Sequence, residues 1–255
     1  MKNIQIGIIG GTGGIGKWFA HFFQKAGYIV HVSGRNTGLD FPALVRQCPV
    51  IIVSVPIKST VEVIKQVGPL MPEKSLLMDF TSLKEEPVKA MLRSSCCEVI
   101  GLHPLFGPEI KALAGHNIVI CPARTKKWHP WIKAVFKKSL ARIIETTPER
   151  HDAWMAQVQV LNHLNTITMG LALKRSGFDL KELYPVSTPA FNAKMELLKK
   201  IFGPNAGLYT QIITHNPHID QVFKDYQQSL SELKKMIIRK DSDGLQKRIK
   251  DTKLF

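Results

Sequence analysis

The sequence predicts an α/β fold: an N-terminal Rossmann-type doubly wound sheet followed by a smaller all-helical domain. Short apolar segments rich in β-branched residues alternate with helical patterns over the first part of the chain. Such alternation is typical of a mostly parallel sheet with helices on both faces. From Pro148 onward only helical patterns follow, broken by proline and glycine turns. We therefore expect one domain over residues 1–147 and a second over residues 148–255.

Several segments have the length and composition of strands in this sheet. They cover residues 4–9, 28–32, 49–55, 75–79, 99–102, 117–121 and 142–145. A long, mostly apolar helix is expected over residues 149–175. Open α/β sheets bind ligands outside the carboxyl ends of their strands. The residues that follow these strands are therefore the candidates for a functional site.

A glycine-rich turn follows the first strand and leads into a helical pattern. Gly11, Gly13 and Gly16 fill the G-x-G-x-x-G pattern. In this context the glycines permit a tight turn, close approach to a pyrophosphate and close packing of helix on strand. The first domain is thus predicted to bind a dinucleotide. The expected contacts are Gly11, Thr12, Gly13, Gly14, Ile15 and Gly16.

The end of the second strand indicates which dinucleotide is bound. An Asp or Glu that would hold an adenine-ribose 2′-hydroxyl is missing there, and the chain reads Ser33-Gly34-Arg35. Ser33 can donate a hydrogen bond to a 2′-phosphate, and Arg35 can pair with it. The sequence therefore favours NADP, with NAD as the alternative. Val55 and Pro56, at the end of the third strand, are expected to line the cofactor ribose.

The composition favours a soluble cytoplasmic protein. The net charge of +15 comes from 35 Lys and Arg against 20 Asp and Glu. Most lysine clusters fall on amphipathic helical segments, so we expect solvated faces that attract an anionic substrate, and no nucleic-acid surface. No signal peptide or membrane span is predicted. The 4 cysteines form no C-x-x-C pair, so we expect reduced thiols and no metal site.

The most informative segment reads Gly-Leu-His-Pro-Leu-Phe-Gly-Pro over residues 101–108. Two prolines and two glycines predict a rigid loop that holds His103. An imidazole that titrates near neutrality is a natural proton acceptor, and beside a nicotinamide it points to oxidation of an alcohol. Ser82 also follows a strand, so we expect both side chains to share one cleft.

Several segments together resemble one enzyme family. They cover residues 10–19, 78–84, 101–108, 149–152, 162–164, 187–189 and 208–209. Over nearly its whole length the chain resembles the prephenate and arogenate dehydrogenases of tyrosine biosynthesis. The resemblance implies NAD(P)-dependent oxidative decarboxylation of prephenate or arogenate to 4-hydroxyphenylpyruvate or tyrosine, with hydride transfer to the nicotinamide. Separately, the helical domain is too small to bury all its apolar faces alone, so we expect a homodimer through it.

The resemblance assigns roles to individual residues. His103 is implied as the catalytic histidine, Ser82 as its partner toward the substrate hydroxyl, and His163 as part of the wall of the substrate pocket. The family usually has an arginine on the helix after the Ser-Thr-Pro segment, whereas this chain has Lys200. A lysine acts as a point charge and cannot bind a carboxylate through the two parallel hydrogen bonds of an arginine. The ring carboxylate can therefore be held by another group, and Lys84 is a second candidate.

Three other classes compete with this interpretation. A short-chain dehydrogenase needs Tyr-x-x-x-Lys, but no tyrosine of this chain is followed by lysine at that spacing. A deazaflavin-dependent or other NADP-dependent reductase would share the glycine turn and Arg35, but it gives no reason for the segment around His103. A non-catalytic, cofactor-sensing Rossmann protein would leave Ser82 and His103 without a task. Turnover of prephenate would separate an enzyme from a sensor.

Overall fold

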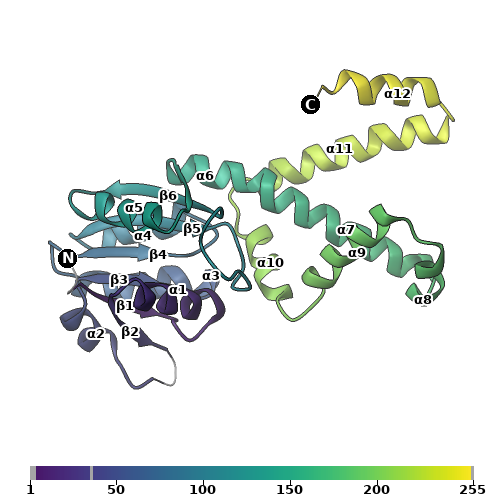
Figure 1. The fold of residues 1–255 in the computed structure, drawn as a ribbon. Helices are drawn as coiled ribbons and strands as arrows, with labels where there is room; N and C mark the ends of the chain where they lie inside the picture. The colour runs from purple at the N-terminus through teal and green to yellow at the C-terminus, as the bar shows by residue number, and fades with distance from the viewer. Residues whose placement is uncertain (1–3, 35–36, 254–255) are drawn as a thin grey trace.

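The computed structural model describes residues 4–34 and 37–253, and it confirms the α/β fold. A seven-stranded sheet of order β2-β1-β3-β4-β5-β6-β7 is packed between helices, and a helical domain extends from one side of it (Figure 1). The strands are β1 (Gln5–Ile9), β2 (Ile29–Ser33), β3 (Val50–Val53), β4 (Leu76–Asp79), β5 (Glu98–Pro104), β6 (Asn117–Arg124) and β7 (Arg142–Glu145). Neighbouring strands pair in parallel, apart from β5 and β6, which are antiparallel.

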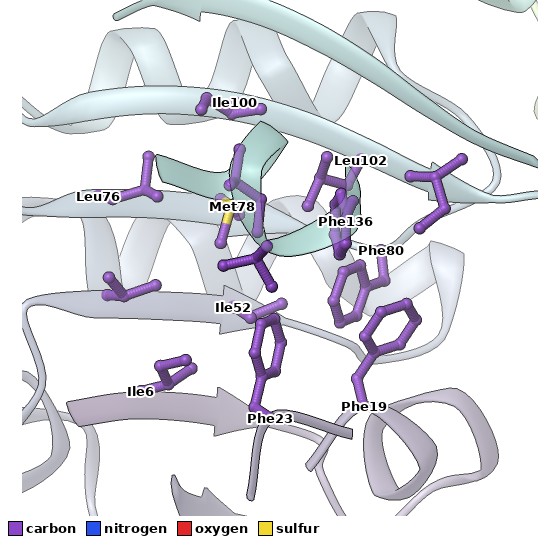
Figure 2. Close-up of a cluster of buried hydrophobic side chains, with 14 of the residues drawn as sticks. Ile6, Phe19, Phe23, Ile52, Leu76, Met78, Phe80, Ile100, Leu102 and Phe136 are labelled. Atoms are coloured by element: carbon purple, nitrogen blue, oxygen red, sulfur yellow. The ribbon is translucent and has the colours of Figure 1, made fainter. Parts of the chain in front are cut away.

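Side chains alternate between the two faces of the sheet, so each strand contributes to two cores. The helices that cover the sheet are α1 (Gly14–Lys25), α2 (Phe41–Gln47), α3 (Ile57–Val67), the short η1 (Gly68–Leu70), α4 (Glu85–Ser94) and α5 (Trp128–Lys138). On one face, Ile52 and Met78 pack with aromatic rings from α1 and α5 (Figure 2). On the other face, Ile51 and Leu77 pack with α2, α3 and α4. Burial on both faces explains why the strands read as continuous apolar runs.

The helical domain begins with one long, nearly continuous helix. Its elements are α6 (Pro148–Met155), the π-helical η2 (Ala156–Leu161), α7 (Asn162–Ser176), α8 (Leu180–Leu183), η3 (Tyr184–Val186), α9 (Pro189–Ile201), α10 (Ala206–Thr214), α11 (Ile219–Ile238) and α12 (Ser242–Asp251). The Thr147 hydroxyl accepts a hydrogen bond from the Arg150 amide and so starts α6. The helix expected over residues 149–175 is therefore confirmed, with a π-helical interruption that its apolar pattern does not reveal. The domain boundary at residue 147 stays a prediction, because α6 itself packs on the sheet domain.

The helical domain has a small core of its own. Its central buried cluster comprises Ala156, Val160, Ile212 and Val222. Large apolar side chains on its surface stay exposed, among them Phe178, Val186, Phe202 and Ile238. No helix in the described part of the chain is long and apolar enough to cross a membrane.

His103 lies within β5 and not in a loop, so that expectation was wrong. The strand runs on to Pro104 because β6 returns antiparallel and pairs with it, His103 opposite Val119. On its other side, the pairing of β5 with β4 stops at Gly101. At Pro104, β5 therefore has no paired strand on the side of β4, so the missing amide hydrogen breaks no sheet hydrogen bond on that side.

Close packing at the glycine turn predicts a measurable effect on stability. A Cβ on Gly16 would lie 2.4 Å from the Gly10 carbonyl oxygen. We expect Gly16→Ala to lower the free energy of unfolding by about 1 to 3 kcal/mol, as overpacking does. Gly207, also in the first turn of a helix, has open space where a Cβ would stand, with no atom within 4 Å. Urea denaturation should therefore show Gly207→Ala to be neutral or slightly stabilising, and equal losses in both variants would contradict the packing argument.

Candidate active site

The glycine turn forms a tight cradle at the carboxyl edge of the sheet. Gly10 has a φ of +80°, and a Cβ there would lie 2.3 Å from the Ser54 carbonyl oxygen at the end of β3. A Cβ on Gly11 would lie 2.8 Å from the Val32 side chain. Side chains are thus excluded from the turn by contacts with β2 and β3. The chain backbone itself is left to face a ligand between β1 and β3, where the strand order reverses.

The start of α1 suits a phosphate group. Gly13 is its N-cap, no side chain of the described residues caps the helix, and its first turn holds no acidic residue. Thr12, Gly13 and Gly14 are exposed, whereas Ile15 is half-buried. Backbone amides at such an open N-terminus attract anions. The residues present therefore fit the pyrophosphate of a dinucleotide, with half-buried Val55 and exposed Pro56 at the neighbouring strand end.

The structure corrects one predicted cofactor contact. Ser33 is buried, and its hydroxyl donates a hydrogen bond to the Leu39 carbonyl oxygen over 2.7 Å. Its proton is therefore already used, and the predicted hydrogen bond from Ser33 to a 2′-phosphate was wrong for this conformation. Arg35, the other predicted contact, lies outside the described residues. Gly34 lies against the glycine turn, since a Cβ there would be 2.9 Å from the Thr12 hydroxyl oxygen.

The segment after β5 packs against α1, the helix that follows the glycine turn. The Trp18 indole nitrogen on α1 donates to the Ile110 carbonyl oxygen over 2.8 Å. The rings of Trp18 and Phe106 meet edge to face with their centroids 5.6 Å apart. A Cβ on Gly14 would lie 3.1 Å from the Pro108 ring. These contacts bring the chain just beyond His103 to the predicted dinucleotide site.

His103 belongs to a chain of three buried polar side chains. Nδ1 of His103 lies 2.9 Å from Nε2 of His151, and Nδ1 of His151 lies 2.7 Å from Oδ1 of Asp152. All three side chains are almost completely buried. His151 and Asp152 come from α6, so the helical segment after the sheet completes a site that begins on β5.

Hydrogen-bond chemistry fixes the protons along this chain. The Asp152 carboxylate also accepts the backbone amides of Lys84 and Glu85, over 2.8 and 2.9 Å. A carboxylate can only accept, so Nδ1 of His151 carries a proton. Neutral His151 then accepts at Nε2, and Nδ1 of His103 must donate to it. His103 is left with a lone pair on Nε2, the arrangement that a general base requires.

Both imidazoles are held in the neutral form. Burial lowers the pKa of His103 well below its usual 6.5, and the neighbouring His151 and the Lys84 cation lower it further. Burial also lowers the pKa of His151, although its hydrogen bond to Asp152 acts in the opposite direction. The sequence predicts titration near neutrality, whereas burial favours loss of the His103 proton at a more acidic pH.

Lys84 does not reach a substrate pocket, so its predicted role as a carboxylate ligand was wrong. The side chain is fully buried and forms an ion pair with Asp79 at the end of β4. Its ammonium also donates to the Leu102 carbonyl oxygen over 2.8 Å. No pattern in the sequence indicates this position, because burial of a lysine depends on the partner that the fold supplies.

The other predicted substrate contacts lie on three different elements. Ser82 is half-buried in the turn between β4 and α4, and its hydroxyl makes no hydrogen bond within the described residues. His163 is half-buried on α7, where its ring meets that of Tyr209 edge to face at 4.9 Å. Burial lowers the pKa of His163, and its Nδ1 has no partner among the residues described. Lys200 is exposed in the last turn of α9. These roles stay predictions.

Sequence reasoning missed two members of the site, His151 and Asp152. The Asp152 side chain accepts the first amides of α4 and not those of its own helix. The adjacent His-Asp pair on a helix that follows the last strand was the available signal. Only the packing of α6 against α4 and β6 turns it toward His103.

Comparisons with known proteins identify the family. Residues 21–145 match the family model for the prephenate dehydrogenase nucleotide-binding domain, and residues 147–251 match that for the prephenate dehydrogenase dimerization domain. The chain is 34% identical over 268 residues to a probable arogenate/prephenate dehydrogenase of Methanocaldococcus jannaschii, covering 98% of this chain and 60% of that protein. It is 31% identical over 240 residues to the T-protein of Haemophilus influenzae, covering 94% and 64%. The chain belongs to the prephenate dehydrogenase family.

Solved structures support the same fold. A Synechocystis arogenate dehydrogenase superposes with a TM-score of 0.75 at 19% identity, covering 98% of this chain and 97% of that one. A prephenate dehydrogenase from A. aeolicus in complex with hydroxyphenyl propionate and NAD+ gives a TM-score of 0.75 at 18% identity, covering 98% and 96%. The chain spans only about 60% of the length of the curated relatives named above.

The two buried, neutral histidines predict how stability depends on pH. Below the ordinary pKa of 6.5, these two histidines become protonated in the unfolded chain but stay neutral in the native state. Their contribution to the free energy of unfolding is therefore fully present above pH 6.5. It falls as the pH drops toward the lowered native pKa, by about 1.4 kcal/mol per pH unit for each such histidine. Denaturant titrations between pH 7.5 and 5 should show a shallower slope for His103→Asn. His21→Asn, on the exposed face of α1, is the matched control, and a His103→Asn slope as steep as that of the wild type would contradict the assignment.

Proposed function

We propose that this protein is an NAD(P)-dependent dehydrogenase that oxidatively decarboxylates prephenate or arogenate. One observation carries the proposal: hydrogen bonding leaves a lone pair on Nε2 of His103, in a strand whose continuation packs beside the glycine turn. A proton acceptor next to a dinucleotide site is what oxidation of an alcohol requires. Membership of the prephenate dehydrogenase family supports the identity of that alcohol.

The chemistry asks little of the protein beyond placement of a proton acceptor. A nicotinamide held at this site would supply the acceptor for the hydride of the carbinol carbon. Nε2 of His103 takes the hydroxyl proton as the carbonyl forms. The ring carboxylate then leaves as CO2, and its bonding electrons make the ring aromatic. His103 returns its proton to the resulting phenolate oxygen, so no net proton is consumed.

The other residues act on orientation and on charge. Nδ1 of His103 donates to His151 throughout the reaction, which fixes the plane of the ring, and the Asp152 carboxylate compensates the positive charge that His103 acquires. The free hydroxyl of Ser82 is available to hold the substrate hydroxyl. His163 and Lys200 are proposed for the side chain and carboxylates of the substrate.

Steady-state assays with prephenate and arogenate against NAD and NADP test the proposal directly. We expect CO2 release and reduced dinucleotide in equal amounts with at least one substrate. A cofactor-sensing protein would bind dinucleotide without turnover. A deazaflavin-dependent or other NADP-dependent reductase would turn over neither substrate.

Replacement of the proposed base gives the sharpest kinetic prediction. We expect His103→Asn to keep the fold and dinucleotide affinity but to lose about 10²- to 10⁴-fold in kcat, as removal of a general base does. In the wild type, kcat should rise with pH through a group whose pKa lies below 6.5, because burial lowers the pKa of His103. That limb should be absent from the variant. A near-normal kcat with an unchanged limb would make His103 a structural histidine.

We further propose NADP as the preferred cofactor, with NAD as the alternative. The segment after β2, from Gly34 to Leu39, carries no carboxylate that would repel a 2′-phosphate, and it includes Arg35. Among the relatives, the prephenate dehydrogenase of Saccharomyces cerevisiae is described as NADP(+)-dependent, and it is 24% identical over 277 residues, covering 98% of this chain and 60% of that protein.

The cofactor proposal is tested by Arg35→Ala. We expect the variant to weaken NADP binding by about 1 to 3 kcal/mol, the scale of a charge-assisted hydrogen bond, and to leave NAD binding nearly unchanged. Dissociation constants for both dinucleotides, measured by fluorescence quenching, supply the comparison. Equal losses for the two dinucleotides would show that Arg35 does not contact the 2′-phosphate.

We also propose a homodimer through the helical domain. The matching family model is described as a dimerization domain. Exposed apolar side chains on α9 and α11, including Leu197, Phe223 and Leu230, leave faces that a second copy would cover. Light scattering of the purified protein would report a mass near twice the 28.6 kDa of one chain.

A further inference from the structure

Lys84 stands where two hydrogen-bond networks meet. Its side chain is directed into the sheet domain, where it bridges the ends of β4 and β5. Its backbone amide is directed toward α6, where it donates to Asp152. One residue therefore contacts both the strand that carries His103 and the carboxylate that orders His151.

The side-chain contacts of Lys84 set the position of β5 relative to the turn that carries Ser82. The ammonium pairs with the Asp79 carboxylate, which also accepts hydrogen bonds from the amide and hydroxyl of Thr81. The same ammonium donates to the carbonyl oxygen of Leu102, the residue just before His103. The turn at Ser82 is thereby held between Thr81 and Lys84 at both of its ends.

The backbone contact of Lys84 extends the network to the second histidine. Oδ1 of Asp152 accepts both the Lys84 amide, over 2.8 Å, and Nδ1 of His151, over 2.7 Å. A displacement of Lys84 would thus move Asp152 and, through His151, the ring of His103. The Ser82 hydroxyl and the His103 imidazole are proposed partners, and Lys84 contacts the residues that position both of them.

We propose that Lys84 is a positioning residue that sets both the orientation of His103 and its readiness to accept a proton, acting through Asp79, Leu102 and Asp152. The inference rests on the proposed function for its kinetic consequence, but the coupling between Lys84 and His103 does not. A fully buried ammonium cannot bind substrate without leaving Asp79, so its charge acts within the protein.

Charge is the second means by which Lys84 acts on His103. The charged or ionisable groups that act on His103 are His151 on α6 and Lys84 at the start of α4. Asp79 on β4 and Asp152 on α6 act in turn on His151. A cation at Lys84 opposes protonation of both imidazoles. Removal of this cation should make His103 easier to protonate and leave less of it in the neutral, accepting form at acidic pH.

The test uses the full chain and two variants. Lys84→Met removes the cation with little change in side-chain length, but it leaves the Asp79 carboxylate buried without its partner. Asp79→Asn with Lys84→Met removes both charges and keeps a folded protein for measurement if the single variant does not fold. Lys89→Met is the matched control, because Lys89 lies on α4 with its side chain 43% exposed and pairs with Glu85 and Glu86.

The first measurement does not depend on activity. Carbon-13 labelled histidine allows each imidazole to be titrated by NMR, with His103 assigned from His103→Asn. We expect the His103 titration to move to higher pH in both Lys84 variants and to stay in place in Lys89→Met. An unchanged His103 titration in a folded Lys84 variant would overturn the inference, whether or not the protein turns over prephenate.

The second measurement separates positioning from substrate binding. With the substrate that the wild type uses, we expect kcat to fall about 10- to 100-fold, as small misplacements of a catalytic group do, while KM changes less than about threefold. The acidic limb of kcat should move to higher pH together with the NMR titration. A raised KM with unchanged kcat would return Lys84 to the role of a carboxylate ligand and overturn the inference. If the wild type itself turns over neither substrate, the proposed function fails, and the NMR titration still decides the coupling.

Discussion

The Asp152 carboxylate joins the two parts of this molecule and orders its candidate site. Its two oxygens accept the first amides of α4, on the sheet domain, and the Nδ1 proton of His151 from its own helix. Two of these three donors come from the sheet domain, so one buried carboxylate helps to hold α6 against it. The Asn216 side chain, which precedes α11, donates to the Asp152 carbonyl oxygen over 3.0 Å and attaches the later helices at the same place.

The same interaction has a chemical consequence at His103. Because the carboxylate at one end of this chain of side chains can only accept, each imidazole donates its proton toward it. The lone pair of the His103 ring is therefore on its other nitrogen, Nε2. Burial then keeps that nitrogen unprotonated well below pH 6.5. In other buried sites a carboxylate likewise selects the tautomer of a histidine and fixes its ring.

The helical domain owes little of its structure to a core of its own. Helix α7 buries no residue fully, and the central cluster of the domain is small. A domain of this kind depends on what packs against it, here the sheet domain through Asp152 and, in our proposal, a second copy of the chain. The π-helical turn η2 follows α6 directly and carries Gln159, whose buried side-chain oxygen has no partner in the described part of the chain.

The sequence by itself determined the architecture and the glycine turn after the first strand, because these depend on local patterns. Apolar periodicity defines strands and helices, and the G-x-G-x-x-G pattern between a strand and a helix indicates the first turn. The tertiary structure decided which polar residues meet. His103 proved to lie in a strand because β6 pairs with it, Lys84 proved to be buried because Asp79 receives it, and His151 joined the site because α6 packs on α4. Ion pairs and hydrogen bonds between residues far apart in sequence leave no periodic signal, so only the folded chain reveals them.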